Sequence, residues 1–174
     1  MDVNRKIDVL GESARFDICS SSCLTVKGQG RKRAPYDLPR WIYPAVRPDG
    51  RRTLLMKVLM SNACRNSCDY CINRCGGAGR PTSFTPDELA RTFLDLNRQG
   101  LAEGLFLSSA VEDDHTMSRM LDAVTILRTR AHFNGYIHLK ILPGATLGHV
   151  ERAVELANRV SVNLEAATAV NLTR

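Results

Sequence analysis

Three cysteines near the middle of the chain have the spacing of a metal-binding loop. Cys64, Cys68 and Cys71 are separated by three and then two residues, within a polar segment. Thiolates this close together can bind one metal centre from a single short loop. Three ligands suit an iron–sulfur cluster in which one iron lacks a protein ligand and stays open to a substrate or cofactor.

Two other interpretations of these cysteines remain open. A structural zinc site needs four ligands, and Cys75 supplies a fourth thiolate in the same segment. Alternatively, the cysteines are small buried residues, which a polar loop makes less favourable. Outside this segment, Cys19 and Cys23 are too few for a second cluster, and the sequence assigns no role to them or to Cys75.

The elements that must position this loop follow from the apolar pattern after residue 52, which alternates between strand and helix. Thr85, Pro86 and Glu88 supply a cap, a favourable first helical residue and a capping box. Runs of apolar residues predict the strands, and helical spacing predicts the helices between them. The predicted strands are 53–60, 104–109, 136–142 and 159–164, and the predicted helices are 85–100, 116–127 and 147–157.

This β-α-β-α-β-α-β order predicts an α/β fold with a parallel sheet. In such folds ligands bind at the carboxyl ends of the strands. The cysteine loop directly follows the first of these strands, so we expect it at that edge. Other polar residues at or just past the later strand ends are candidates for the same site, namely Ser108, Ser109, Lys140, Asn163 and Glu165.

The histidines show no metal-ligand spacing. His138 alternates with Ile137 and Leu139 along a predicted strand, so its side chain is expected to face away from theirs. We predict a structural, hydrogen-bonded histidine there.

The cysteine motif, with Tyr70 as the aromatic residue before the last cysteine, resembles that of the radical S-adenosylmethionine (radical SAM) superfamily. The resemblance extends over residues 53–165. It implies that Cys64, Cys68 and Cys71 hold a [4Fe-4S] cluster whose open iron binds SAM. Reductive cleavage of SAM would then give a radical that abstracts hydrogen from a substrate. The implied fold is a partial (βα)6 barrel, and we expect this chain to be truncated after the fourth strand.

The resemblance also implies contacts with SAM. Ser108 and Ser109, with Ala110, occupy the place where a Gly-Gly-Glu segment often holds the SAM amino group. Lys140 is the candidate partner of the SAM carboxylate. The candidate contacts with the SAM ribose are Asn163 and Glu165.

A narrower resemblance concerns the substrate. Residues 55–64, 70–74, 135–144 and 162–166 are similar to a group of putative DNA modification or repair radical SAM proteins, also described as photolyase-like or spore-photoproduct-lyase-like. This resemblance implies a nucleic-acid substrate, and the superfamily implies a flavodoxin or ferredoxin as electron donor. The alternatives are a small-molecule or protein substrate, or a zinc-stabilised nucleic-acid-binding module without redox chemistry.

Charge and composition predict the kind of partner and the cellular location. The chain has 174 residues and a formal net charge of +6, and residues 1–80 hold 15 Lys and Arg against 7 Asp and Glu. A basic half favours an anionic partner such as nucleic acid. No apolar stretch has the length of a membrane span, so we expect a cytoplasmic protein in which clustered cysteines bind metal. Glycines and prolines predict an irregular basic leader over residues 1–52, followed by the barrel portion over 53–174. Within the leader, residues 6–16 could form one or two amphipathic turns, and the apolar patch 41–43 could dock on the main domain.

Overall fold

In the computed structural model, which describes residues 1–17, 39, 41–46, 50–77 and 79–163, the chain forms one sheet of five strands. The strands lie in sequence order across the sheet, and the first is antiparallel while the other four are parallel. They are β1 (Ile42–Val46), β2 (Arg52–Leu59), β3 (Gly104–Ser108), β4 (Tyr136–Ile141) and β5 (Arg159–Val162). The predicted α/β fold and its four parallel strands are therefore confirmed.

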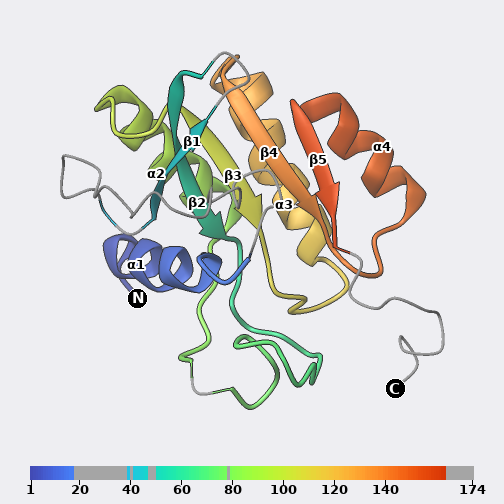
Figure 1. The fold of residues 1–174 in the computed structure, drawn as a ribbon. Helices are drawn as coiled ribbons and strands as arrows, with labels where there is room; N and C mark the ends of the chain where they lie inside the picture. Colours follow the sequence, from blue (N-terminus) through green and yellow to red (C-terminus); the bar gives the residue numbers. More distant parts are fainter. Residues whose placement is uncertain (18–38, 40, 47–49, 78, 164–174) are drawn as a thin grey trace.

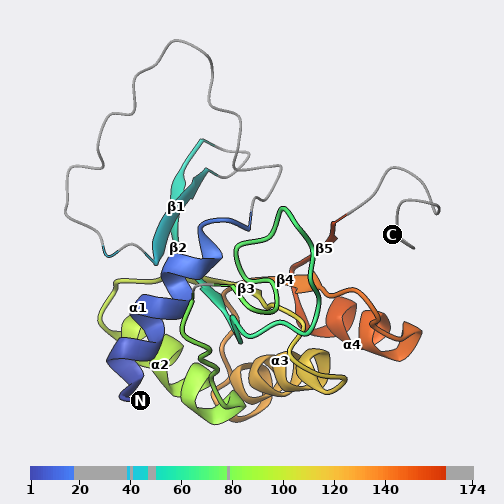
Figure 2. The same cartoon turned by 90° about the horizontal axis from the view of Figure 1, so that it is seen from below.

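Three helices connect the parallel strands and lie together along one face of the sheet (Figure 2). They are α2 (Pro86–Arg98), α3 (Thr116–Thr125) and α4 (Leu147–Leu156). The predicted capping box is present at α2, where the Thr85 hydroxyl accepts a hydrogen bond from Glu88 N at 3.2 Å and Thr85 N donates to Glu88 Oε2 at 2.9 Å. Helix α3 continues directly into a π-helical turn, η2 (Ile126–Arg130).

Side chains alternate between the two faces of each strand, and this alternation separates the core from a polar face. Leu107 and Leu139 are fully buried members of the hydrophobic core. Their sequence neighbours point to the opposite face, where Lys57, Phe106 and His138 stand side by side in register across three strands. We call this second side the inner face of the sheet.

Both N-terminal segments that the sequence singled out as ordered form regular structure. Residues 1–52 contain a helix, α1 (Val3–Ala14), and the edge strand β1, which are longer than the one or two turns and the apolar patch expected there. Pro44 is tolerated because β1 pairs on one side only. Gly11 is needed because a Cβ there would lie 2.3 Å from Cβ of Trp41.

Helix α1 lies beneath the carboxyl end of β2 (Figure 1). Its buried residues are Ile7, Leu10, Gly11 and Ala14, and Trp41 Nε1 donates a hydrogen bond to Asp8 at 3.3 Å. The division into a leader (1–52) and a barrel portion (53–174) stays a prediction. Cys19, Cys23 and Glu165 lie outside the described residues. Among the helices that the structure describes, none is long and apolar enough to cross a membrane.

Candidate metal and cofactor site

The cysteines lie on a long loop between β2 and α2, at the carboxyl end of β2 as predicted (Figure 1). The two ends of this loop are fastened to each other. Asn62 N donates to Thr82 O at 3.1 Å, and Thr82 N donates to Asn62 Oδ1 at 2.7 Å. A bridge between Ser61 and Ser83 adds to this pairing. These contacts therefore close the base of the loop.

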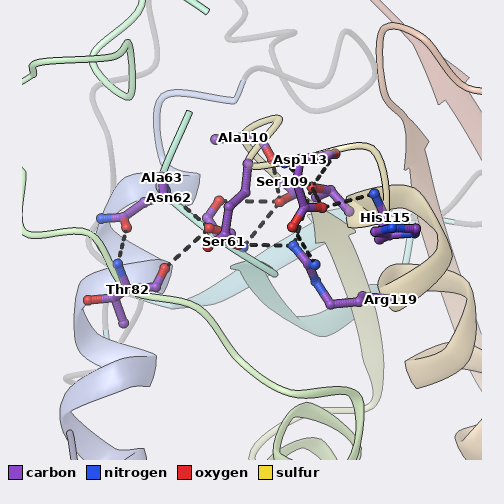
Figure 3. Close-up of polar contacts among 11 residues, drawn as sticks. Ser61, Asn62, Ala63, Thr82, Ser109, Ala110, Asp113, His115 and Arg119 are labelled. Carbon is purple, nitrogen blue, oxygen red and sulfur yellow. Dashed lines mark hydrogen bonds and ion pairs between the residues drawn. The ribbon is translucent and has the colours of Figure 1, made fainter. Parts of the chain in front are cut away.

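The same base is fastened to the segment that follows β3 (Figure 3). Ser61 N donates to Ser109 Oγ at 3.1 Å, and the Ser109 hydroxyl donates to Ala110 O at 2.7 Å. Ala110 N in turn donates to Ser61 O at 2.9 Å. Ser109, predicted to contact SAM, thus has a bracing role between two strand ends. Its contact with SAM stays a prediction.

The segment between β3 and α3 is itself held by an arginine. Arg119 contacts Asp113 Oδ2 at 2.8 Å and Glu112 Oε2 at 3.0 Å, while Asp113 Oδ1 accepts from His115 N at 2.9 Å. The hydrogen bond from Arg119 holds the pKa of Asp113 below its usual value. This ordered segment gives the cysteine loop a firm neighbour.

The four cysteines of the loop are free thiols. Cys64 and Cys71 are half-buried, while Cys68 and Cys75 are exposed. Asn66 N lies 3.4 Å from the Cys64 sulfur in a hydrogen bond, a contact of the kind that tunes iron–sulfur clusters. Within the described part of the chain, no three His, Cys, Asp or Glu side chains are arranged to hold a metal ion.

The donor set nevertheless fits an iron–sulfur cluster. Thiols are the ligands that such clusters prefer, and three of them are carried here by one loop with a fastened base. The sulfurs are not gathered in the structure, so the loop would have to draw them together to hold a cluster. The assignment of Cys64, Cys68 and Cys71 as ligands remains a prediction.

A pocket of about 180 Å³ lies inside the loop, and its lining includes both Cys64 and Cys75. Cys75 N donates to Asn66 O at 2.8 Å, so the chain turns back on itself at this point. Gly77 permits the turn, since a Cβ there would lie 2.9 Å from Ile72 O. Cys75 therefore shares a space with a predicted ligand, and the four-thiolate zinc alternative stays open.

Two of the predicted strand-end residues meet on the inner face. The Ser108 hydroxyl and the Lys140 ammonium bind the two carboxylate oxygens of Asp17, one each. Both are buried, with 1% of Ser108 and 5% of Lys140 exposed. The Lys57 ammonium donates to the backbone oxygen of Asp17 at 2.7 Å. Sequence reasoning missed Asp17, because nothing in the pattern around it signals a contact with β3 or β4.

The remaining predicted residues are not part of this cluster. Tyr70 is 70% exposed on the cysteine loop. Asn163 is exposed just after β5, and Glu165 lies outside the described residues. Their predicted contacts with SAM therefore rest on the sequence alone.

His138 gives the inner face a neutral polar group. Only 2% of its surface is exposed, and its Nε2 lies 2.8 Å from the Ser161 hydroxyl. Burial, with Arg159 and Lys140 nearby, lowers the pKa of His138 to about 4. The ring meets Phe106 edge to face at 4.8 Å. The prediction of a hydrogen-bonded strand histidine is confirmed.

Comparisons with known proteins agree with this architecture. The family model described as "Radical SAM superfamily" matches residues 58–172. No curated protein matches the chain. Among solved structures, the one described as "Crystal structure of HydG: A maturase of the [FeFe]-hydrogenase" is similar, with a TM-score of 0.51 and 19% sequence identity over 63% of this chain.

That match concerns the fold, in which the open sheet and its helices resemble part of a (βα) barrel. It covers 25% of the HydG chain, so this chain spans about a quarter of that protein's length. Neither match supports the narrower DNA modification or repair group.

Proposed function

The chain belongs to the radical SAM superfamily, and on this premise we propose that it carries the cluster-binding and SAM-binding part of such an enzyme. The proposed ligands of the [4Fe-4S] cluster are Cys64, Cys68 and Cys71. When bound, the cluster supplies the electron for reductive cleavage of SAM, which yields the radical that abstracts hydrogen from a substrate.

One observation carries this proposal: the cysteine loop is fastened beside a polar inner face at the same edge of the sheet. Ser61, at the base of the loop, is hydrogen-bonded to Ser109, which follows β3. Ser108, the residue before it, points to the inner face and lies with Lys140 around one carboxylate. A ligand on this face would therefore lie within reach of the loop, as a shared site requires.

The chain's own residues would divide the work of holding SAM. An ammonium such as that of Lys140 suits the SAM carboxylate, and the Ser108 hydroxyl can donate to the same group. Backbone carbonyls near Ser109 and Ala110 would accept from the SAM amino group, since the acidic residue often found there is absent. Asn163 and Glu165 are the proposed contacts with the ribose.

The test is reconstitution of the protein with iron and sulfide in the absence of oxygen. We expect a brown protein with about four irons that forms 5′-deoxyadenosine from SAM when reduced. Cys64→Ala, Cys68→Ala and Cys71→Ala should each lose the cluster, while Cys75→Ala, from the same loop, should keep it. A colourless protein that binds one zinc, and loses it in Cys75→Ala, would contradict the proposal and support the zinc module.

A second, more detailed proposal concerns the substrate and the electron donor. The excess of basic residues over 1–80 supports an anionic polymer, and nucleic acid is the first candidate. Its most basic run, 31–33, lies outside the described residues. A small-molecule or protein substrate is the second candidate, favoured by the fold shared with a protein named as a maturase. A flavodoxin or ferredoxin is the proposed electron donor.

DNA binding measured against salt concentration separates the two substrate candidates. Phosphate contacts predict that the logarithm of the binding constant falls steeply and linearly with the logarithm of salt concentration. Weak binding without salt dependence would contradict a nucleic-acid substrate.

A further inference from the structure

The carboxylate of Asp17 fills a small anion site on the inner face. Asp17 follows the end of α1, and its backbone N–H donates to Ala14 O at 3.1 Å. From there its side chain reaches Ser108 on β3 and Lys140 on β4, which are 91 and 123 residues away in the sequence. One donor binds each carboxylate oxygen, so the site holds a carboxylate in a defined orientation.

A buried lysine needs such a partner. Transfer of an ammonium group from water to the protein interior is costly unless an opposite charge and hydrogen bonds compensate. Among the described residues, the ion pair of Lys140 is with Asp17. The site is therefore built to hold a carboxylate, and the chain itself supplies one.

The body of α1 is held independently of Asp17. Lys6 Nζ forms an ion pair with Glu88 at 2.7 Å, and Asp8 accepts from the Trp41 indole at 3.3 Å. Gly11 packs directly against the Trp41 side chain. These contacts, together with the fully buried Ala14, hold the whole of α1 without any contribution from Asp17.

The segment that directly follows α1, residues 15–17, is held more weakly. Arg15 N and Phe16 N donate to carbonyls of the preceding turn at 3.2 and 3.4 Å, at the long end of hydrogen-bond distances. Phe16 is exposed. Asp17 contacts Lys57 on β2, Ser108 on β3 and Lys140 on β4, and these contacts tie residues 15–17 to the sheet.

We propose that Asp17 is an internal latch: it occupies a carboxylate site made by Lys140 and Ser108, and a carboxylate-bearing ligand binds there only when residues 15–17, just after α1, withdraw. This inference rests on the proposed function, because SAM is a ligand of that chemistry. It adds a competition between the ligand and the chain itself. The apparent affinity for the ligand is then the intrinsic affinity multiplied by the fraction of molecules in which the latch is open.

The test compares Asp17→Asn with Asp8→Asn in the reconstituted full chain. Each variant removes one negative charge from the α1 region and keeps an oxygen that can accept a hydrogen bond. The probes are SAM and decarboxylated SAM. We expect Asp17→Asn to bind SAM about tenfold more tightly than the wild type, while decarboxylated SAM changes less than about twofold and Asp8→Asn matches the wild type.

Unchanged or weaker SAM binding by Asp17→Asn would overturn the latch and leave Asp17 as a structural tether. An equal gain in affinity for SAM and for decarboxylated SAM would also overturn the latch, because the competition with Asp17 would then not involve the carboxylate of the ligand. If Asp17→Asn fails to fold, Lys140→Gln serves instead. It should remove the preference for SAM over decarboxylated SAM, and a preserved preference would contradict the site.

Hydrogen exchange separates failure of the latch from failure of the proposed function. In the wild type, SAM should speed exchange of the amides of Arg15, Phe16 and Asp17. Acetate should do the same relative to chloride at equal ionic strength, with or without a cluster. If the protein forms a cluster and cleaves SAM but the exchange of these amides does not change, the latch is contradicted and the proposed function stands. If acetate speeds their exchange in a protein that never forms a cluster, the proposed function is contradicted and the latch stands.

Discussion

The inner face of the sheet and the cysteine loop lie at the same edge of the sheet, but they are organised to different degrees. On the inner face, Ser108, His138 and Lys140 are buried, and each has a hydrogen-bond partner. On the loop, Cys68 is exposed and the thiols are not gathered around a common point. The inner face holds its polar side chains in place, with Asp17 in the carboxylate site. The loop would take its final shape only on binding metal, because metal binding and local folding are coupled.

The boundary between the ordered inner face and the less ordered cysteine loop lies at the base of the loop. Ser61 and Asn62 are buried and fastened to Ser109 and Thr82, so they belong to the ordered side. Beyond Ala63, Arg65 N still donates to Val111 O at 2.8 Å, and a run of exposed residues begins at Ser67. Variants on either side of this boundary should therefore separate effects on cluster binding from effects on stability.

The largest effect is expected from Cys68→Ala. Loss of one of the three proposed ligands should abolish iron binding. Because Cys68 is exposed, the free energy of unfolding of the iron-free protein should change by less than about 0.5 kcal/mol. Iron analysis and urea unfolding check the two parts. A large loss of stability in the iron-free protein would show that the loop is as organised as the face.

The pH dependence of stability probes the inner face. His138 has a pKa lowered from 6.5 to about 4, so the unfolded chain binds a proton in this range that the folded protein does not. Its contribution is fully present above pH 6.5 and is lost as pH falls towards 4, by about 3 kcal/mol in total. The difference in unfolding free energy between wild type and His138→Gln should follow this curve. A constant difference between pH 4 and 7 would contradict it.

Asn62→Ala tests the boundary. Asn62 is 8% exposed, and its amide donates to Arg80 O at 3.1 Å while its oxygen accepts from Thr82 N. Removal should cost about 1–3 kcal/mol of unfolding free energy, because buried backbone groups lose their partners. Asn73→Ala, beyond the boundary, is the matched control, with an expected cost below about 0.5 kcal/mol. Equal costs would show that the boundary is misplaced.

Ser109→Ala should have the smallest effect, about 1 kcal/mol. It leaves Ser61 N without its hydroxyl partner but keeps the backbone bond between Ala110 N and Ser61 O. Thermal unfolding measures the loss, and Ser67→Ala on the exposed loop is the control. A stability equal to the wild type's, with weaker SAM binding, would instead assign Ser109 to the cofactor.

Features with local signals were predictable from the sequence. The strands β2 to β5 follow from short apolar runs, and α2 follows from the capping box of Thr85 and Glu88. The position of the cysteine loop followed from the order of strands and helices. Each of these depends on residues that are close together in the chain.

Features that depend on distant contacts were not predictable. The sequence marked 6–16 and 41–43 as segments that could be ordered, but not that Trp41 covers Gly11 and so packs the two against each other. Asp17 gains its role only when residues of β3 and β4 reach it. No local pattern distinguishes it from an ordinary helix-end aspartate.

The π-helical turn η2 is a second example. Helical spacing predicted α3 up to residue 127, but gave no sign of a wider turn after it. The guanidinium of Arg128, within this turn, donates to the carbonyls of Gly135 at 2.9 Å and Leu156 at 2.8 Å and to the Asn158 side chain at 2.8 Å. The turn therefore joins α3 to the starts of β4 and β5 through contacts that no short window of sequence contains.

The antiparallel strand β1 also limits how the sheet can grow. Both edges of β2 are taken, one by β3 and the other by β1. A complete ring of parallel strands would need the outer edge of β2 as its closing seam, and that seam is already occupied. Among the described strands, β5 is therefore the edge at which a further strand could continue the parallel order.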